Sequence, residues 1–235
     1  MASVRAIERI ADGVTAFSLA LDDADRALDW RPGQFVSIAC GEDAEGNPLL
    51  RSYSIASAPR NELGEILLII KLVPGGKAST WLAALSVGAR VRFTGPMGFF
   101  VNDLAHPGDV VYAATGVGVA PLLPMMRETL ARTAESGHVH FFWGVRHEAD
   151  LFWSREVMSL AGPRFSSTVH VSQPAGDWQG ARGRITTPIL ELSSRLAQPT
   201  FYLCGSGAMI TELKTRLVAA GVNRKKQIRT EAFFD

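Results

Sequence analysis

The uncharged stretch from Val110 to Met126 constrains the fold of this chain more than any other segment. It reads as a buried strand, a turn at Gly116 and Gly118, and the start of a helix at Pro121. Such a strand–turn–helix presents free backbone N–H groups and the positive end of a helix dipole, so it can bind a phosphate. A membrane-spanning helix is the alternative, but it needs roughly 20 residues and would not contain two glycines and two prolines. We therefore favour a phosphate-binding turn.

The segments before and after His106-Pro107-Gly108 follow different patterns. Short strands with turns between them fill the first part, near residues 4–10, 14–21, 34–40, 49–55, 65–73 and 90–94, with one short helix near 79–85. Strands and helices then alternate, with strands near residues 110–114, 139–144, 165–172, 200–204 and 227–231. The first pattern is typical of an antiparallel barrel, and the second of a parallel sheet covered by helices. We predict two domains, an antiparallel β-barrel (1–102) and an α/β parallel-sheet domain (103–235).

Composition and charge exclude several classes of function. The net charge of +1 gives no general attraction to nucleic acids or to a membrane surface. The two cysteines, Cys40 and Cys204, are too few for a disulfide framework or for an iron–sulfur cluster held by four cysteines. His138 and His140 are expected to form a surface pair on one strand face rather than a metal site. The first ten residues lack the apolar core of a signal peptide, which indicates a cytoplasmic protein.

The first motif is Arg51-Ser52-Tyr53-Ser54. On a strand, Arg51 and Tyr53 share one face, and Ser52 and Ser54 share the other. A guanidinium beside a phenol suits an aromatic ligand with a phosphate tail, because the first binds the phosphate and the second covers a ring or sugar. The alternative is an ordinary edge strand.

A second glycine turn, Gly75-Gly76-Lys77-Ala78-Ser79, lies between a predicted strand and the short helix. Its glycines expose N–H groups, and Ser79 is a natural N-cap, so the segment can also bind a phosphate. A plain turn with a capping serine is the alternative. Two such turns in two domains indicate a dinucleotide-sized ligand in each.

These residues carry a family resemblance when they are taken in order. The motifs are Arg51-x-Tyr53-Ser54, Gly76-x-x-Ser79, Gly95-Pro96-Met97-Gly98-x-Phe100, Thr115-Gly116-x-Gly118-x-Ala120-Pro121 and Cys204-Gly205-x-x-x-Met209. Together they resemble the ferredoxin–NADP reductase family of flavoproteins, and the resemblance covers essentially the whole chain. Each motif alone is weak, and the ordered set is strong.

The resemblance implies FAD on the barrel and NADPH or NADH on the second domain. On the barrel, Arg51 and Ser79 would hold the diphosphate, Tyr53 and Ser54 would line the isoalloxazine, and the FAD site would also include Ser52, Ile69, Lys71, Val73, Gly76, Lys77 and Ala78. On the second domain, Thr115, Gly116 and Gly118 would face the pyrophosphate. Cys204 would pack by the nicotinamide, with Gly205 and Met209 in the same motif.

Hydride transfer brings the nicotinamide and the flavin to roughly 3–3.5 Å between reacting atoms. The resemblance implies that Ser54, Cys204 and Glu231 surround this point as the catalytic residues. Cys204 could instead be a small core residue, and Glu231 a solvated carboxylate near the end of the chain. Phe233 or Phe234 could cover the flavin or its adenine, or simply dock the terminus into the core.

The choice between NADPH and NADH stays open at this point. A 2′-phosphate is bound by arginines, and the candidates are Arg146, Arg184 and the neighbouring Arg182. In contrast, Ser172-Gln173-Pro174 stands where the NADPH-specific bacterial relatives tend to carry another arginine, and Trp178-Gln179-Gly180 resembles the NADH-using relatives.

The electron acceptor would be a separate molecule, because the chain cannot hold a four-cysteine cluster. Ferredoxin, flavodoxin and an oxygenase component are the expected partners. A direct flavin, ferric or quinone reductase is one alternative, and an electron-transfer subunit of a larger complex is another. A nucleotide-free binding module would leave Arg51, Tyr53 and both glycine turns without a role.

Overall fold

The structure is a computed structural model that describes residues 1–22, 28–59, 64–132 and 137–233. The chain divides into two compact units, Met1–Val101 and Asn102–Asp235, which are described separately below.

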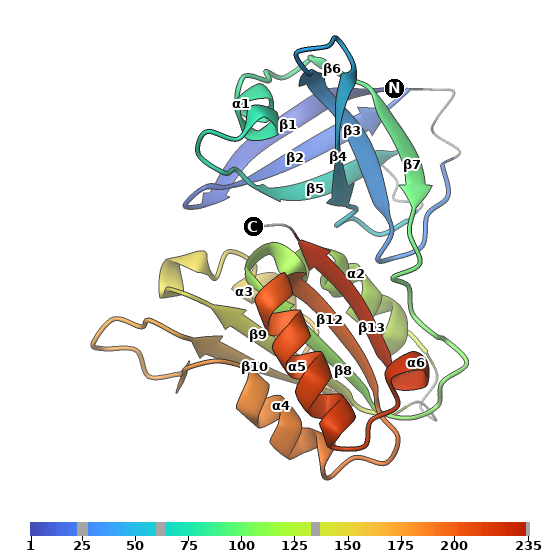
Figure 1. Cartoon of the computed structure of the whole chain (residues 1–235), viewed down its shortest axis with the longest axis vertical. Helices are drawn as coiled ribbons and strands as arrows, with labels where there is room; N and C mark the ends of the chain where they lie inside the picture. The colour runs from blue at the N-terminus through green and yellow to red at the C-terminus, as the bar shows by residue number, and fades with distance from the viewer. Residues whose placement is uncertain (23–27, 60–63, 133–136, 234–235) are drawn as a thin grey trace. The chain divides into compact units, whose positions relative to one another are not determined.

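The first unit is built from two antiparallel sheets and one short helix (Figure 1). One sheet has the order β5-β2-β1-β6, and the other has the order β4-β3-β7. Their strands are β1 (Ala2–Ala11), β2 (Val14–Leu21), β3 (Phe35–Glu42), β4 (Pro48–Ser54), β5 (Glu65–Lys71), β6 (Arg90–Val91) and β7 (Phe93–Met97). The helix α1 (Lys77–Ala83) follows β5. A bridge between Ile55 and Leu68 links the two sheets, so that they curl around one core.

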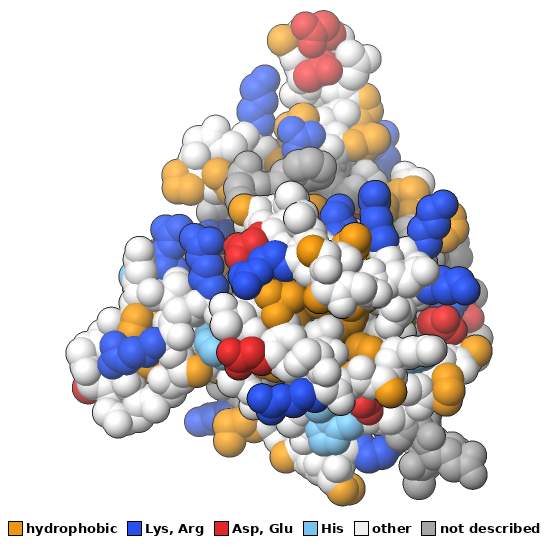
Figure 2. Space-filling model, turned by 60° about the horizontal axis from the view of Figure 1, so that its bottom comes forward, with side chains coloured by type: hydrophobic (Ala, Val, Ile, Leu, Met, Phe, Trp, Pro, Cys, Tyr) orange, Lys and Arg blue, Asp and Glu red, His pale blue; other side chains and the backbone are white. Residues whose placement is uncertain are grey.

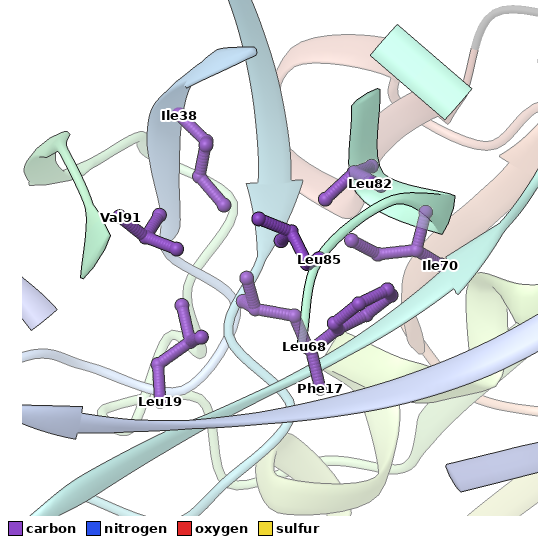
Figure 3. Close-up of a pocket in the computed structure, with 8 residues that line it drawn as sticks. All are labelled: Phe17, Leu19, Ile38, Leu68, Ile70, Leu82, Leu85 and Val91. Atoms are coloured by element: carbon purple, nitrogen blue, oxygen red, sulfur yellow. The ribbon is translucent and has the colours of Figure 1, made fainter. Parts of the chain in front are cut away.

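Alternate residues of these strands fill the interior of the barrel with apolar side chains. Figure 3 shows Phe17, Leu19, Ile38, Leu68, Ile70, Leu82, Leu85 and Val91 pointing toward one another. The space between them has no room for a water molecule. This interior is therefore a packed core, and a ligand of this unit has to bind on its outer surface.

The second unit contains a parallel sheet of six strands in the order β11-β10-β9-β8-β12-β13 (Figure 1). They are β8 (Val110–Thr115), β9 (Val139–Val145), β10 (Phe165–Val171), β11 (Ala181–Arg182), β12 (Thr200–Ser206) and β13 (Ile228–Phe233). The helices are α2 (Val119–Leu130), α3 (Ser154–Met158), α4 (Thr186–Ser193), α5 (Gly207–Ala219) and α6 (Arg224–Gln227), with short turns η1 (Gly116–Gly118) and η2 (Glu148–Asp150).

Both faces of this sheet are covered, which explains the uncharged run in β8. Val111 and Ala113 pack in the cluster that α4 and α5 complete on one face. On the other face, the Tyr112 hydroxyl donates to Asn102 Oδ1 (2.6 Å) and lies 2.7 Å from Thr129 Oγ1 of α2. This buried network links Asn102, at the beginning of the unit, to α2 through Tyr112. The hydroxyl groups in it have hydrogen-bond partners, as buried polar groups require.

The order of the sheet reverses between β8 and β12. The chain runs outward from β8 through β9 and β10 to β11, and it returns on the other side of β8 with β12 and β13. In open α/β sheets, ligands bind at the carboxyl ends of the strands at such a reversal. The carboxyl ends of β8 and β12 hold Thr115-Gly116 and Cys204-Gly205.

One predicted helix is shifted in the structure, and two short elements of the structure were not predicted. The predicted helix near 79–85 begins two residues earlier, at Lys77, with Gly76 as its N-cap. The strand β11 and the helix α6 were not predicted, because two and four residues are too short to show a periodic pattern.

Within the described ranges, no helix is long and apolar enough to cross a membrane. Figure 2 shows one face on which Lys and Arg side chains are spread among acidic and uncharged groups, in keeping with the net charge of +1.

Candidate cofactor-binding sites

The strand β4 presents Arg51 and Tyr53 on the same face. Both pair in register with core residues of β3, Arg51 with Ile38 and Tyr53 with Val36. The Arg51 side chain is exposed, and its Nη1 donates to the carbonyl oxygen of Leu50 (2.8 Å). The Tyr53 ring packs against the edge of the core. The face thus combines an exposed cation with a half-buried aromatic ring. The cation suits the phosphate of a ligand, and the ring suits an attached ring system.

Burial, and secondarily the neighbouring thiol of Cys40, raises the pKa of the Tyr53 phenol, so the phenol is neutral at pH 7. Burial also raises the pKa of Cys40. Cys40 is not among the site residues that the sequence predicts. In the sequence, Cys40 follows Val36 and Ile38 at every second position of one strand. This pattern predicts a core residue and does not indicate a ligand.

The two serines of this motif lie on the opposite face of β4. Ser52 is exposed and pairs with Ser37, while Ser54 is half-buried and pairs with Phe35. The strand ends at Ser54, and the next residue is the buried Ile55, whose N–H donates to the Gln34 carbonyl (2.9 Å). Ser54 therefore lies at the end of a strand whose position is fixed by the core.

The turn before α1 is closed by its own residues. The Val73 N–H donates to Ser79 Oγ (2.9 Å), and the Gly76 N–H donates to the Val73 carbonyl (3.0 Å). A Cβ at Gly76 would lie only 3.2 Å from that carbonyl and 3.4 Å from Ser79 Oγ, so a glycine fits best there. Ser79 is therefore not the N-cap that the sequence predicts, because its hydroxyl holds Val73 instead.

The start of α1 has no side-chain cap, so its first N–H groups remain for a ligand. The other residues predicted for this site lie along the same segment: Lys71, Val73 and Lys77 are exposed, Ala78 is half-buried, and Ile69 is buried. The segment therefore carries two exposed lysines, Lys71 and Lys77, which give it a positive charge.

In the second unit, the turn after β8 and the end of β12 approach each other so closely that both need glycine. A Cβ at Gly118 would lie 2.4 Å from the Cys204 carbonyl oxygen, and a Cβ at Gly205 would lie 2.3 Å from Thr115 Oγ1. Gly205 also has a φ of +124°, which disfavours other residues. Beside Gly116 (φ +51°), in contrast, a Cβ would meet nothing within 4 Å. The turn is thus tightly packed on the side of β12 and open at Gly116.

Two hydrogen bonds hold this turn in place. Thr115 Oγ1 accepts from the N–H of Ser206 (2.9 Å), and the indole N–H of Trp143 donates to the carbonyl oxygen of Gly116 (3.0 Å). Neither η1 nor α2 has a side-chain cap. The positive end of the α2 dipole therefore lies at this turn, and no neighbouring atom crowds the position of a Cβ at Gly116. Trp143 was missed, because a tryptophan in a buried strand resembles any core residue.

Cys204 and Glu231 are neighbours across the β12–β13 pair. Cys204 is fully buried, and burial, followed by the nearby charge of Glu231, raises the pKa of its thiol. The thiol is therefore neutral and unsuited to nucleophilic chemistry. Glu231 is half-buried, and burial raises the pKa of its carboxyl group. The pair offers a small neutral side chain next to a carboxyl group that holds its proton more tightly than usual.

The remaining predicted residues are spread around this unit. Arg146 is exposed just beyond β9, and its carbonyl accepts from the Gln173 N–H (2.9 Å). Arg184 is largely exposed, with Nη1 3.7 Å from Glu212 Oε2. Met209 packs in the core at the start of α5, and Phe233 pairs with Ser206. Phe234 lies outside the described residues. Among the residues that the structure describes, no group of three or more His, Cys, Asp or Glu could hold a metal ion.

Two family descriptions match most of the chain. The oxidoreductase FAD-binding domain matches residues 1–101, and the oxidoreductase NAD-binding domain matches residues 113–215. Ferredoxin–NADP reductase B of Sorangium cellulosum is 32% identical over 202 residues, which are 82% of this chain and 81% of that protein. The ferredoxin–NAD(P)(+) reductase component of the naphthalene 1,2-dioxygenase/salicylate 5-hydroxylase systems of a Ralstonia species is 31% identical, over 96% of this chain and 70% of that protein.

Solved structures agree with these matches. A cytochrome P450 reductase of Amycolatopsis superposes with a TM-score of 0.85 at 28% identity, over 99% of this chain and 68% of that one. A ferredoxin NADP+ reductase from Neisseria gonorrhoeae, solved with FAD and NADP, has a TM-score of 0.81 at 20% identity, over 99% of this chain and 98% of that one, which shows a shared fold.

The chain therefore belongs to the ferredoxin–NAD(P) reductase family of flavin-dependent oxidoreductases. The two-part fold, the FAD and nicotinamide cofactors and the enzyme class that the sequence predicts are confirmed.

Proposed function

We propose that this protein takes a hydride from NADPH or NADH and passes single electrons to a ferredoxin, a flavodoxin or an oxygenase component. One observation carries the proposal: the mutual packing of Gly118 against the Cys204 carbonyl and of Gly205 against Thr115. It places an uncapped helix start beside a neutral buried thiol, at the reversal of a parallel sheet. This arrangement holds the pyrophosphate and the nicotinamide end of one ligand together.

In the first unit, we assign the FAD diphosphate to Arg51 and to the turn of Gly76, Lys77, Ala78 and Ser79. Tyr53 and Ser54 border the ring system, with Ser52 in the same strand, and the segment of Ile69, Lys71 and Val73 flanks the cofactor. The exposed guanidinium of Arg51 and the uncapped start of α1 support this assignment. FAD, when bound, would accept one hydride, which carries two electrons, and release these electrons one at a time, which would match a two-electron donor to one-electron carriers.

In the second unit, we assign the pyrophosphate to Thr115, Gly116 and Gly118, and the nicotinamide to Cys204, with Gly205 and Met209 behind it. Ser54, Cys204 and Glu231 are the proposed catalytic residues. Cys204 excludes water as a neutral side chain, and the raised pKa of Glu231 allows that carboxyl group to hold a proton. Phe233 is proposed to cover the flavin or its adenine, and Arg146 and Arg184 to meet a 2′-phosphate when NADPH is the donor.

The acceptor is proposed from chemistry and from the relatives. The two cysteines of this chain cannot hold a four-cysteine cluster, so the next redox centre belongs to another molecule or domain. The Sorangium and Ralstonia relatives are both described as ferredoxin reductases. Longer relatives exist as well, and this chain spans 56% of the propane 2-monooxygenase reductase component of Rhodococcus jostii. A cytoplasmic location is part of the proposal, and cell fractionation tests it.

The test is an anaerobic titration of the purified, FAD-loaded protein. Addition of NADPH or NADH should bleach the yellow colour, and re-oxidation should follow when a ferredoxin or flavodoxin is added. Free flavin, ferric complexes and quinones form the comparison set at equal concentration. A protein that takes up no FAD would refute the proposal. Faster re-oxidation by the small acceptors than by every protein carrier would assign a direct reductase instead.

A further inference from the structure

Trp143 lies on β9 at the level of Ala114 of β8, on the sheet face that carries Tyr112 and α2. Its side chain is fully buried, and Phe152 meets the indole edge-on, with ring centroids 5.5 Å apart and an interplanar angle of 82°. The indole N–H reaches past the end of β8 to the carbonyl oxygen of Gly116 (3.0 Å). A side chain of the core strand β9 is therefore hydrogen-bonded to the backbone of the turn at Gly116.

The bonded carbonyl belongs to the peptide between Gly116 and Val117. Because a trans peptide is planar, its N–H points opposite to its C=O. With the carbonyl held toward the indole, the Val117 N–H is directed away from it. Gly116 has a φ of +51°, and a Cβ there would meet nothing within 4 Å, so no side-chain packing holds this peptide. The backbone bonds of η1 and the hydrogen bond from the indole therefore set its orientation together.

The other contacts of the turn hold its two ends. Thr115 Oγ1 accepts from Ser206 before the turn, and Gly118 abuts the Cys204 carbonyl after it. Both of these contacts come from β12, whereas the contact from Trp143 comes from β9 on the other side of β8. Each contact thus fixes a different part of the turn.

We propose that Trp143 is a positioning residue that orients the Gly116–Val117 peptide for the pyrophosphate of NADPH or NADH. The inference rests on the proposed function, because it assumes that the pyrophosphate binds at this turn. A tryptophan that merely fills the core would contribute to stability alone. A positioning residue has a second effect, which is confined to the diphosphate part of the ligand.

The variant that separates these roles is Trp143→Phe, which keeps an aromatic ring and removes the N–H donor. The loss of one hydrogen bond to the turn should raise the KM for NADPH or NADH about five- to tenfold. The kcat at saturating nucleotide should stay within about twofold, because the nicotinamide end is not touched. FAD affinity should not change. Phe152→Leu is the matched control, since it loosens the packing of the indole and leaves the donor in place.

Calorimetry on the FAD-loaded protein gives a readout that does not need turnover. ADP, which carries a diphosphate, should bind about five- to tenfold more weakly to Trp143→Phe, while adenosine should bind equally to both proteins. Equal loss for ADP and adenosine, no loss for either, or the same loss in Phe152→Leu would each overturn the inference. A wild-type protein that binds no ADP would instead refute the nucleotide site itself, so the two failures are distinguishable.

Discussion

Replacing Gly118 with alanine tests the close approach that defines the nucleotide site. Gly118 has helical backbone angles (φ −59°, ψ −16°), so alanine costs nothing in conformation. Its Cβ would lie 2.4 Å from the carbonyl oxygen of Cys204 and 2.7 Å from the carbonyl carbon. Real Cβ contacts are not shorter than 3.0 Å, so α2 and β12 have to separate by about 0.6 Å. No flexible side chain can absorb this shift, because both atoms are backbone.

Overpacking of this kind costs about 1–3 kcal/mol, offset by about 0.4–1 kcal/mol from the lower entropy of the unfolded chain. We expect a net loss of roughly 1–2 kcal/mol, which lowers the melting temperature by about 2–8 °C. The displaced turn should also weaken ADP binding about tenfold or more. Thermal unfolding of the FAD-loaded protein and calorimetry with ADP measure the two effects, and FAD retention reports separately on the first unit.

Gly207→Ala is the matched control, since a Cβ there meets nothing within 4 Å and the residue begins α5. It should leave stability unchanged or raise it by up to about 1 kcal/mol. The steric reasoning fails if Gly118→Ala melts and binds ADP like the wild type. It also fails if the two alanine variants behave alike.

Three further substitutions test single residues. Arg51→Ala should weaken FAD binding about tenfold, because one charge-assisted hydrogen bond to the diphosphate is lost. The fluorescence of released flavin measures the FAD affinity. An unchanged affinity would show that Arg51 does not bind FAD. Arg184→Ala should raise the KM for NADPH and leave the KM for NADH unchanged. Steady-state kinetics with the two nucleotides in parallel measure both values. An equal change in the two KM values would exclude a role of Arg184 at the 2′-phosphate. The raised pKa of Glu231 gives stability that is present at acidic pH and lost as the pH rises through the folded-state pKa. Glu231→Gln should therefore gain stability relative to the wild type as the pH rises toward neutrality. Denaturant unfolding of both proteins across this pH range measures the effect. A difference between their denaturant midpoints that is the same at every pH would contradict the prediction.

The sequence predicts those parts of the fold in which pattern and burial coincide. The run from Val110 to Ala114 is buried on both faces, as its uninterrupted apolar sequence predicts for a parallel strand with both faces covered. The alternation of Arg51 with Ser52 fixed which side chains share a face. In such segments the sequence pattern alone predicts which side chains are buried or share a face.

Other contacts could not be predicted, because the same residue type serves several purposes. Ser79 could cap a helix or hold a preceding loop, and only the fold shows that its hydroxyl accepts from Val73. Trp143 and Cys40 sit in apolar strands, where a core position explains them fully. The polar contact of Trp143 depends on Gly116, which lies 27 residues away in the sequence.

The nucleotide turn owes its shape to the core of the second unit. Its fixed points are a carbonyl of β12, a side chain of β8 and an indole of β9, and all three lie within a sheet whose strands are covered on both faces. A site that is held by strands is positioned more accurately than one that is carried by a loop alone. The same construction makes the site sensitive to small changes, because a shift of β12 toward α2 meets Gly118 directly. Substitutions in the core behind Cys204 are therefore expected to alter nucleotide affinity before they alter FAD binding, which depends on the other unit.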